Sequence, residues 1–420
     1  MQSVEEFVEQ LYKQQSAKLL AVLTRLFGVH NFSLAEDTLQ EAFAKALSVW
    51  RQQGLPNKPE AWIINCAKNT ALDVIRRHKT TLKFADDLQY FLASEWSLSN
   101  TLEQQFSAPK IKDDQLRMIF VCCNMPLKLS SCIPFILKNL CGLSIKAVSR
   151  ALVLPEAVIK KRLQRAKAQL QLQTFGFPEP QQHNQVLDKV HNVLYLLFNE
   201  GFHSSDSQPL NLMFCHEAIG LVKLLLDDPD IANQETLGLL SLMYFHLGRA
   251  ESRVDSDGFN VPIDLQDRTQ WQAADFARAR ECIALAKINN NGSAGRFFLE
   301  SLIAQEHCRA LTFDQTNWPI IVELYRHLVF ITQSPVAKLN LYIALAYSGE
   351  VEDAIFQVEQ LLVDKKLQKS HMPLAILAHL NAMAGRSKLA LTQAEQSMKL
   401  GGTSHEHRLL MQQVKRQLKG

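Results

Sequence analysis

The sequence predicts an all-α protein in which two small helical domains precede an α-solenoid. Three observations lead to this prediction. Apolar residues recur at helical spacing along most of the chain, the alternation of apolar and polar residues that marks a strand is absent, and glycines stand at intervals between the periodic segments. The chain has 420 residues, of which 47% are hydrophobic, so it can form two or three domains with sizeable cores.

The periodic segments form an ordered series of blocks. We expect a helical domain at residues 1–80, a linker at 81–112, a second helical domain at 113–172 and, after the breaker-rich "FGFPEPQQ", a long helical domain at 183–420. Residues 1–172 hold 23 Lys and Arg against 15 Asp and Glu, a net charge of +8, although the whole chain carries only +3. The remainder carries −5, so an anionic partner is expected for the first part alone.

The cysteines and the N-terminus bear on the cell compartment. Eight cysteines are scattered along the chain, with Cys122 and Cys123 adjacent, and none has the spacing of a zinc site, so we expect reduced, buried thiols. The start, "MQSVEEFVEQ", lacks a signal-peptide pattern, and no apolar run approaches the ~20 residues that span a bilayer. These features predict a soluble cytoplasmic protein without membrane contact, metal or cofactor.

The first informative stretch is "SLAEDTLQEAFAKALSVW". Ser33 and Glu36 have the spacing of a capping box, so a helix is expected to begin at Ser33. Its buried stripe is expected to comprise Leu39, Ala42, Phe43, Ala46, Leu47 and Trp50. Asp37, Gln40 and Glu41, which we call the acidic patch, fall on the opposite face. An acidic patch in a basic domain suits a basic protein surface rather than DNA, although an ordinary solvated helix face is an equally good interpretation.

A second helix is predicted over "PEAWIINCAKNTALDVIRRHK", with amides and cations on one side. This side comprises Asn65, Lys68, Asn69, Leu72 and Arg76, and Arg77 and Lys79 lie near the C-terminal end. Amide side chains can recognise bases while cations hold phosphate, which favours a nucleic-acid surface. Cations near a helix C-terminus also complement the helix dipole, so a purely structural role stays open. Trp62 is expected in the core rather than as a stacking platform.

A pair of helices is predicted in "GLSIKAVSRALVLPEAVIKKRLQRAKAQL". Ser144 is expected to cap the first helix, a turn follows at Val153 and Leu154, and Pro155 suits the first turn of the second. The second helix has a buried stripe of Ile159, Leu163, Ala166 and Leu170, and its other faces carry Lys160, Lys161, Arg162, Arg165 and Lys167. This is the helix-turn-helix pattern, whose second helix enters the major groove of DNA. A solvated basic helix is the alternative.

The long C-terminal region contains a loose repeat. "LYIALAYSGEVEDAIFQVEQLL" and "LAHLNAMAGRSKLALTQAEQSM" each predict a helix, a glycine turn and a second helix. Gly349 and Gly385 lie 36 positions apart, close to the tetratricopeptide period of about 34 residues. "SLMYFHLGRAE", with Gly248, looks like an earlier and weaker copy. Such pairs stack into a solenoid with a concave face, although generic antiparallel helices give a similar pattern.

A cluster of aspartates interrupts this region at "DSDGFNVPIDLQDRTQW". It holds Asp255, Asp257, Asp264 and Asp267, but the spacing and the final Glu of a calcium-binding EF-hand loop are missing. We therefore expect Asp264, Asp267 and Arg268 to form internal ion pairs or a loop network rather than a metal site.

These motifs together resemble a known family. "AEDTLQEAF", "WIINCAKNTALDVIRR" and the helix-turn-helix segment are similar to the two conserved domains of an extracytoplasmic-function sigma factor, a group IV member of the sigma-70 family. "LFNEGF", "CHEAIGLVKLLL" and "SPVAKLNLYIALAYSGE" resemble the C-terminal extension of the subgroup with a tetratricopeptide-like domain. The resemblance implies a protein without catalysis of its own that binds core RNA polymerase and directs promoter recognition and transcription initiation. The charge difference between the two parts predicts regulation in cis by the C-terminal domain.

The resemblance also implies roles for single residues. Asp37, Gln40 and Glu41 match the surface for the clamp helices of the polymerase's largest subunit. Candidates for binding the −10 promoter element are Asn65, Lys68, Asn69, Asp73, Arg76 and Arg77, and candidates for the −35 element are Pro155, Glu156, Lys160, Lys161, Arg162, Arg165 and Lys167. One departure is "MPLKLSSCIPFILKNLCGLS", which lacks the charged run common before the helix-turn-helix, so no promoter sequence is carried over.

Two other functions stay open at the level of sequence. One is a one-component transcriptional regulator, with a helix-turn-helix and a solenoid sensor, but such a protein has no need of the acidic patch. The other is a tetratricopeptide scaffold that binds peptides. An enzyme is the least supported class, because the chain has no glycine-rich phosphate loop, nucleophile elbow or metal-ligand cluster.

Overall fold

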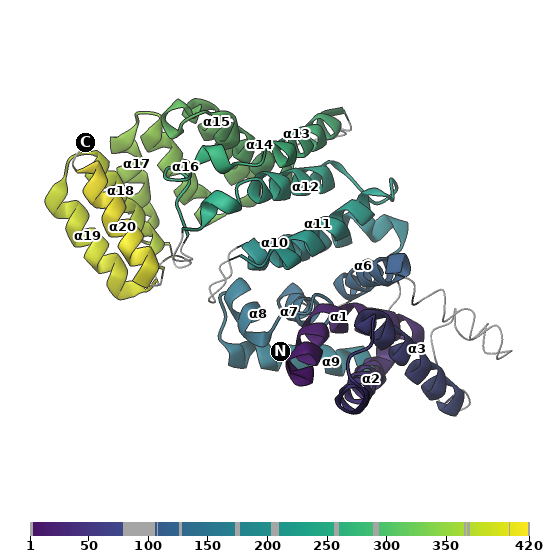
Figure 1. The fold of residues 1–420 in the computed structure, drawn as a ribbon. Helices are drawn as coiled ribbons and strands as arrows, with labels where there is room; N and C mark the ends of the chain where they lie inside the picture. The colour runs from purple at the N-terminus through teal and green to yellow at the C-terminus, as the bar shows by residue number, and fades with distance from the viewer. Residues whose placement is uncertain are drawn as a thin grey trace. The chain divides into compact units, whose positions relative to one another are not determined.

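The fold is all-α, as the sequence predicts. The computed structural model describes residues 3–78, 106, 108–125, 128–172, 177–202, 210–255, 260–288, 294–364, 367, 370–402 and 404–418. Within these residues every regular element is a helix, apart from one isolated bridge between Val254 and Asn260 (Figure 1). None of the helices described is long and apolar enough to cross a membrane.

The chain divides into two compact units. Unit 1 comprises Met1–Ser204 and Asn211–Ile231, and unit 2 comprises Ser205–Leu210 and Ala232–Gly420. The sequence predicts a C-terminal domain from residue 183, but the two helices after that position pack with unit 1. Most of the predicted linker, residues 81–105 and 107, lies outside the described residues.

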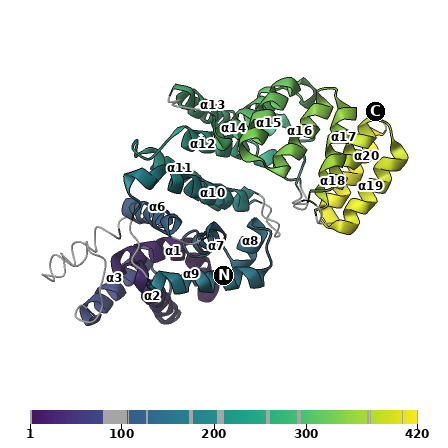
Figure 2. The same cartoon turned by 180° about the vertical axis from the view of Figure 1, so that it is seen from behind.

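Unit 1 begins with three long helices that pack on one another. The helices that follow pack in part on these three and in part on each other. Its elements are α1 (Val4–Phe27), η1 (Val29–Asn31), α2 (Phe32–Gln53), α3 (Pro59–His78), α6 (Ala108–Asn124), α7 (Leu129–Asn139), α8 (Ile145–Ala151), α9 (Glu156–Leu172), η2 (Pro180–Gln182), α10 (His183–Phe202) and α11 (Leu212–Leu226). Helix α1 contacts α2, α3 and α6, and both α10 and α11 contact α6 (Figure 2). Trp50 of α2 is 1% exposed and meets Trp62 of α3 edge to face at 5.3 Å, so Trp62 packs at the edge of the core and is itself half-buried.

Helix α7 explains the unusual apolar segment before the helix-turn-helix pattern. Its residues Cys132, Phe135, Ile136 and Leu137 are all buried. The helix contacts α6, α8 and α9 and is also covered by α1 and α10. Phe135 packs against Phe32, at the start of α2, with ring centroids 5.0 Å apart. A helix surrounded on so many sides has no face for a run of charged residues.

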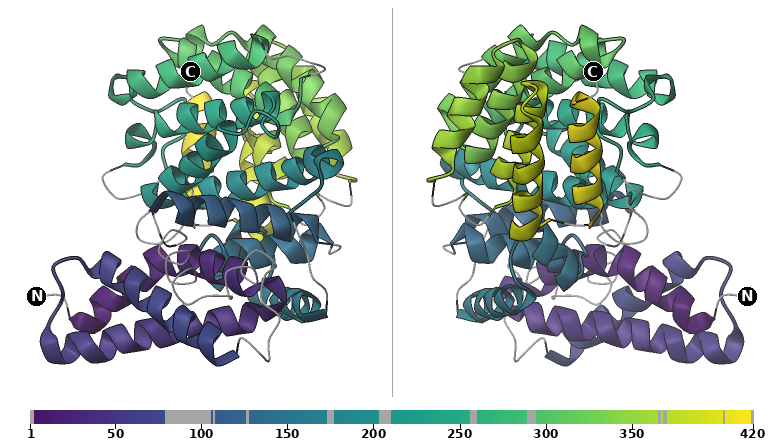
Figure 3. Two further views of the ribbon diagram at one scale, coloured as in Figure 1. Left: turned by 90° about the vertical axis from the view of Figure 1, so that its right-hand side faces the viewer. Right: turned by 90° about the vertical axis from the view of Figure 1, so that its left-hand side faces the viewer.

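Unit 2 is a series of helices that pack mainly on their neighbours in the chain. Its elements are α12 (Gln234–Leu247), η3 (Glu251–Arg253), η4 (Arg268–Gln270), α13 (Ala273–Ile288), α14 (Arg296–Arg309), η5 (Phe313–Gln315), α15 (Trp318–Thr332), α16 (Pro335–Tyr347), α17 (Val351–Leu361), α18 (Met372–Met383), α19 (Ser387–Leu400) and α20 (Ser404–Gln417). Consecutive helices contact one another from α12 to α20, and the last ones are drawn in yellow (Figure 3).

The two predicted helix pairs of unit 2 are present. Gly349 joins α16 to α17 with φ 105°, and Gly385 joins α18 to α19 with φ 73°, a conformation that favours glycine. The earlier copy at Gly248 differs from the prediction. Gly248 has φ −62°, and α13 begins only at Ala273. The reason is that the aspartate-containing segment 255–271, which we call the aspartate-rich loop, is inserted between α12 and α13.

The cysteines agree with the expectation of free, buried thiols. All eight are free, seven are buried, and Cys308 is half-buried. Burial raises the pKa of the Cys122 and Cys141 thiols well above the ordinary value. Buried thiols with raised pKa values remain protonated at neutral pH and are poor nucleophiles.

Candidate functional site

Helix α2 presents the acidic patch on its exposed face. Asp37, Gln40 and Glu41 are all exposed. The predicted stripe of α2 is buried except for Leu47, which is half-buried. The predicted helix start at Ser33 is wrong. The helix begins at Phe32 and continues from η1, because the Phe32 ring is buried against α7, so Ser33 lies inside the helix.

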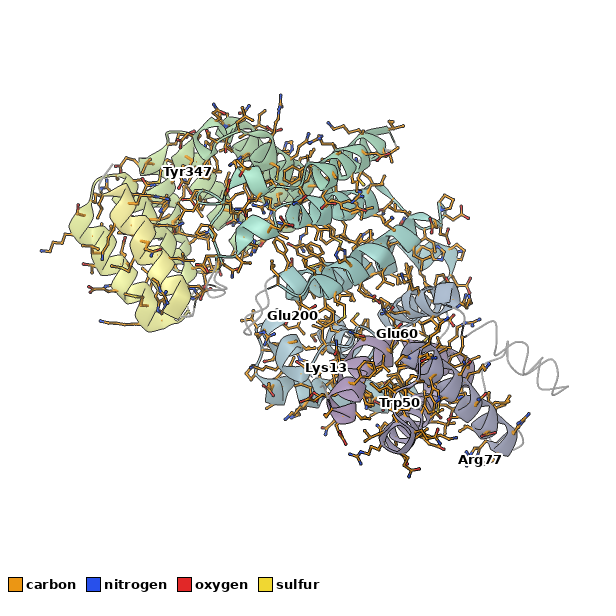
Figure 4. The ribbon with its side chains drawn as sticks, in the orientation of Figure 1. Lys13, Trp50, Glu60, Arg77, Glu200 and Tyr347 are labelled. Carbon is orange, nitrogen blue, oxygen red and sulfur yellow. The ribbon has the colours of Figure 1, made fainter. Side chains whose placement is uncertain are left out.

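Helix α3 carries its polar candidates along one exposed side. Asn65, Asn69, Asp73, Arg76 and Arg77 are exposed, and Lys68 is half-buried. Arg76 lies 3.8 Å from Asp73, and Figure 4 shows Arg77 at the far end of the helix. The opposite side is buried, with Ile63 and Ala67 fully covered. The result is a strip of amides and cations about three turns long on a fixed support.

Helices α8 and α9 have the predicted boundary chemistry. Ser144 caps α8, since its hydroxyl accepts a hydrogen bond from the Ala147 amide at 3.0 Å. The turn before α9 places Val153 at φ 52°, a left-handed conformation that is unusual for a β-branched residue. The predicted stripe of Ile159, Leu163, Ala166 and Leu170 is buried.

The seven candidates on α9 and its preceding turn fall into two groups. Pro155, Glu156, Lys160, Lys161 and Arg165 are exposed. Arg162 and Lys167 are half-buried, and both contact other helices of unit 1. Five of the seven candidates are therefore accessible to a partner, and two of the five cations are engaged within unit 1.

Arg162 contacts the backbone of α7. Pro134 lies inside α7 and has no N–H, so it cannot donate to the carbonyl of Ser130 four residues earlier. The Arg162 guanidinium donates to that carbonyl oxygen, with Nη1 at 2.8 Å. Arg162 thus satisfies a backbone group that the proline leaves open.

Lys167 contacts the start of α2. Its ammonium lies 2.7 Å from both carboxylate oxygens of Glu36 and 5.5 Å from the centroid of the Phe32 ring. The lysine side chain is 39% exposed and that of Glu36 is 23% exposed, so water screens this pair only in part. The contact joins the helix that carries the acidic patch to the basic helix α9.

A buried carboxylate joins α1 to α6. Asp114 is fully buried and lies 3.2 Å from the Arg25 guanidinium and 3.8 Å from the Lys110 ammonium. Burial raises the pKa of Asp114 to about 6, and the two cations oppose that rise. The ion pair between Arg25 and Asp114 therefore connects α1 to α6.

Helices α10 and α11, which we call the bracing helices, contact α1 as well as the later helices α6 and α8. Lys18 of α1 forms a 2.8 Å ion pair with Glu217 of α11, and both side chains are less than a quarter exposed. Arg150 of α8 forms an ion pair with Glu200 of α10, labelled in Figure 4. Lys189 of α10 donates to the Cys123 carbonyl oxygen of α6 at 3.1 Å.

Gly201 sets the distance between the bracing helices. A Cβ at this position would lie 2.7 Å from the Asn211 carbonyl oxygen and 2.9 Å from the Cys215 amide nitrogen. Both are backbone atoms, which cannot move aside as a side-chain tip can. The segment "NEGF" therefore supplies the ion-pairing Glu200 and the close helix approach at adjacent positions.

The described residues of the aspartate-rich loop form a network of hydrogen bonds and an ion pair. Asp264 forms an ion pair with Arg416 of α20, and Asp267 accepts hydrogen bonds from the amide and hydroxyl of Thr269 at 2.9 and 2.6 Å. Arg268 donates to the His307 carbonyl oxygen at 2.9 Å and to that of Ala310. Asp257 lies outside the described residues, among which no group of three or more His, Cys, Asp or Glu could hold a metal ion.

Comparison with known proteins adds a family assignment to this geometry. The Sigma-70 region 2 family matches residues 11–81, and a family of unknown function (DUF6596) matches residues 186–287. An uncharacterized protein of Rhizobium meliloti (strain 1021) is 32% identical over 347 residues, which cover 81% of this chain and 80% of the relative. No solved structure matches the chain.

The chain belongs to the family of this Rhizobium meliloti relative. Its sigma-70 region 2 domain, which includes most of α1 and all of α2 and α3, supports its placement among the sigma-70 factors and suggests sigma-factor activity in transcription. A domain of this kind implies binding to core RNA polymerase and to promoter DNA.

Proposed function

We propose that the protein is an extracytoplasmic-function sigma factor that acts in the cytoplasm and is regulated in cis by the helices that follow α9. The observation that carries this proposal is the sorting of exposed charge. Helix α2 exposes the acidic patch, while α3 and α9 expose amides and cations, all on one basic part of the chain. The region 2 match supports this function over a one-component regulator or a scaffold.

The acidic patch is proposed to bind the clamp helices of the polymerase's largest subunit. Asp37 and Glu41 are like charges one helical turn apart, which slightly destabilises an isolated helix. Such a pair serves no purpose in packing, because both side chains are exposed. A basic partner surface would remove their repulsion on binding.

The two polar helices are proposed to share promoter recognition. Helix α3 would contact the −10 element through Asn65, Lys68, Asn69, Asp73, Arg76 and Arg77. Helix α9 would contact the −35 element through Pro155, Glu156, Lys160, Lys161 and Arg165. In this division Arg162 keeps its contact with α7, and Lys167 contributes to DNA binding only after it leaves Glu36.

The proposed regulation follows from a comparison between the distance that separates the two promoter elements and the diameter of unit 1. The −10 and −35 elements are about 25 base pairs apart, or about 85 Å at 3.4 Å per base pair. A compact unit of about 225 residues has a radius of gyration of about 17 Å, and hence a diameter near 45 Å. We propose that unit 1 must open to occupy both elements, and that the bracing helices hold it closed.

Binding to core polymerase can be tested by charge reversal. The double variant Asp37→Arg and Glu41→Arg should weaken binding of purified core enzyme more than about 30-fold, roughly 2 kcal/mol, because like charges would then meet. Run-off transcription from the protein's own upstream region should fall in parallel. Titration of labelled core enzyme at low ionic strength measures the affinity.

The matched control reverses two exposed carboxylates of unit 2, Glu359→Arg and Glu395→Arg, and changes the net charge equally. This control should bind core enzyme like the unaltered chain. Equal weakening in both variants would mean that net charge, and not the acidic patch, controls binding, and no binding by the unaltered chain would remove the sigma-factor proposal.

The closed arrangement can be tested with a charge swap at the bracing helices. Lys18→Glu places like charges at a partly buried contact with Glu217, so the closed form should lose stability. Transcription should rise by roughly tenfold for each 1.4 kcal/mol by which the closed form is destabilised relative to the open form, up to the level of a fully open protein. The double swap Lys18→Glu with Glu217→Lys should restore the original output in the same run-off assay.

Lys13 provides the control on the same helix. It pairs with Glu9 at 2.7 Å, but both side chains are 67% exposed, so Lys13→Glu should leave transcription nearly unchanged (Figure 4). If Lys18→Glu lowers output, or if the double swap fails to reverse its effect, the bracing helices do not inhibit the protein in this way.

A further inference from the structure

Unit 2 contains a half-open cavity that the proposed transcription function does not use. The cavity has a volume of about 470 Å³ and is lined by helices α14, α15, α16, α18 and α20 and by the loop at residues 262–264. Binding sites for small molecules have volumes of this order and are lined mainly by apolar and aromatic side chains. The helices come from successive pairs, so the cavity arises from the way unit 2 winds.

One wall of the cavity is aromatic. Trp318 and Tyr347 are stacked, with ring centroids 4.6 Å apart and planes at 16°, and Figure 4 labels Tyr347. Phe313 meets both rings edge to face, at 5.3 and 5.2 Å. The His307 ring also lies edge-on to Trp318 at 5.4 Å. Rings in these orientations present flat faces and edges that favour a planar aromatic guest.

Two histidines supply unused hydrogen-bonding capacity. The Tyr347 hydroxyl and Nε2 of His379 are 2.9 Å apart. The Nδ1 atoms of His307 and His379 have no hydrogen-bond partner among the described residues, and because other protein atoms cover them, a guest can reach them only when a ring turns. Burial lowers the pKa of His307 to about 4 and also lowers the pKa of His379, so both rings are neutral at pH 7. A neutral imidazole nitrogen can donate or accept one hydrogen bond, according to its tautomer.

The charged groups at the cavity leave its interior neutral overall. The Asp264 carboxylate, 10% exposed, is paired with the Arg416 guanidinium. Glu406 also lines the cavity, but its side chain is exposed. A buried charge on a guest would lack a free counter-charge, so a neutral guest is favoured.

The aspartate-rich loop fixes one side of the cavity. Arg268 donates to the carbonyl oxygens of His307 and Ala310 at the end of α14, and its guanidinium lies 4.5 Å from the Trp271 ring centroid. Trp271 in turn donates to the Ser252 hydroxyl at 2.8 Å. Together with the Asp264 ion pair, these contacts hold residues 262–264 in place, so the cavity is formed before any guest arrives.

We propose that unit 2 binds a neutral, planar aromatic small molecule of about two fused rings that carries one hydrogen-bonding group, with its rings against Trp318 and Tyr347 and its polar group at the histidines. The proposal is independent of the sigma-factor function, because it concerns the cavity of unit 2 alone.

Three related probes test the proposal on the full-length chain. Isothermal titration calorimetry is performed with 2-naphthol, with naphthalene, which lacks the hydroxyl, and with decahydro-2-naphthol, which lacks the aromatic rings. We expect saturable binding of 2-naphthol, at least about tenfold tighter than that of decahydro-2-naphthol. No binding of 2-naphthol up to its solubility limit, or equal affinity for the saturated alcohol, would overturn the proposal.

Three variants locate the bound molecule. Ala375→Phe fills the cavity from α18 and should weaken 2-naphthol binding at least about tenfold, whereas Ala375→Ser should retain it. His379→Leu keeps the aromatic wall and should reduce the preference for 2-naphthol over naphthalene by about fivefold. Thermal unfolding by circular dichroism checks that each variant is folded. Unchanged affinity in a folded Ala375→Phe variant, or an unchanged preference in His379→Leu, would overturn the assignment.

Discussion

Most of the polar residues of unit 1 that the sequence singles out lie on the outer faces of α2, α3 and α9, whereas in unit 2 one such residue, Asp264, lines a half-open cavity. In unit 1 the Trp50 side chain fills the core between helices and packs against the half-buried Trp62. In unit 2 the comparable pair, Trp318 and Tyr347, forms the wall of a cavity. The same residue types therefore serve packing in one unit and leave space for a guest in the other.

The difference shows how partner size shapes a helical protein. A macromolecular partner such as polymerase or DNA meets a broad outer face, so its binding needs no cavity behind that face. A small molecule is bound most tightly when it is largely surrounded, and a winding series of helices can leave room for it. The predictions below test each side of this contrast, starting with the largest effect.

The largest effect is expected at the close approach of the bracing helices. Gly201→Ala places a methyl group against backbone atoms of Asn211 and Cys215, so unit 1 should lose about 2–3 kcal/mol of stability. Gly220→Ala, in the neighbouring helix α11, meets nothing within 4 Å and should gain about 1 kcal/mol from helix propensity.

Urea unfolding followed by hydrogen exchange of peptides from α10 and α12 separates the two units. The α12 peptides should be unaffected by either glycine variant. If Gly201→Ala proves as stable as Gly220→Ala, the helices can separate freely and do not brace unit 1.

The second prediction concerns the pH dependence of the stability of each unit. Each unit contains a buried histidine that stays neutral in the folded protein. Burial lowers the pKa of His191 in α10 to about 3 and that of His307 in α14 to about 4, below the unfolded value near 6.5. The unfolded chain therefore binds more protons, and stability falls as the pH drops below about 6.5. For His191 the slope is about 1.4 kcal/mol per pH unit until the pH nears 3.

The histidine contribution is isolated by comparing variants with the unaltered chain at pH 7 and pH 5. His191→Gln should flatten the pH dependence of the unit 1 transition alone, and His307→Gln that of unit 2 alone. Equal pH slopes with and without His191 would show that the histidine does not remain neutral in the folded protein.

The smallest effect is expected at the two non-glycine residues with positive φ among the described residues, one in each unit. Val153 has φ 52° and is 89% exposed, so Val153→Gly should remove strain without loss of packing and raise stability by up to about 1 kcal/mol. Gln333 has φ 50°, but its side chain donates to the Phe330 carbonyl oxygen at 2.9 Å, so Gln333→Gly should gain less. Thermal unfolding measures both changes, and a larger gain at Gln333 would contradict the strain argument.

Much of the fold was predictable from local pattern. The all-α class, the buried stripes of α2 and α9, the Ser144 cap and the glycine turns of unit 2 all depend on residues within one or two helical turns. The start of α2 was predicted one residue late, and the packing of the residue missed, Phe32, against Phe135 more than a hundred positions later left no local signal. The placement of α10 and α11 in unit 1 likewise depends on distant partners such as Lys18.

The candidate surfaces were predictable in composition but not in accessibility. Helical spacing places the seven −35 candidates on or beside α9, yet it does not show that Arg162 and Lys167 contact α7 and α2. The available signal for Arg162 was Pro134 inside an apolar helix. Because proline has no N–H, the carbonyl oxygen four residues earlier lacks its helical hydrogen bond and needs another donor. The cavity of unit 2 left no local signal, because Asp264, Trp318 and Gln413 lie far apart in the sequence.

The hydrogen bond between Arg162 and the carbonyl that Pro134 leaves open has a consequence for how such proteins diversify. If α9 selects promoters, paralogues that acquire new targets should change freely at Glu156, Lys160 and Arg165, while positions 134 and 162 should change together or not at all. A recombinant library that randomises the whole outer surface of α9 would then lose folded members mainly through position 162, and retargeting should succeed best when that arginine is left untouched.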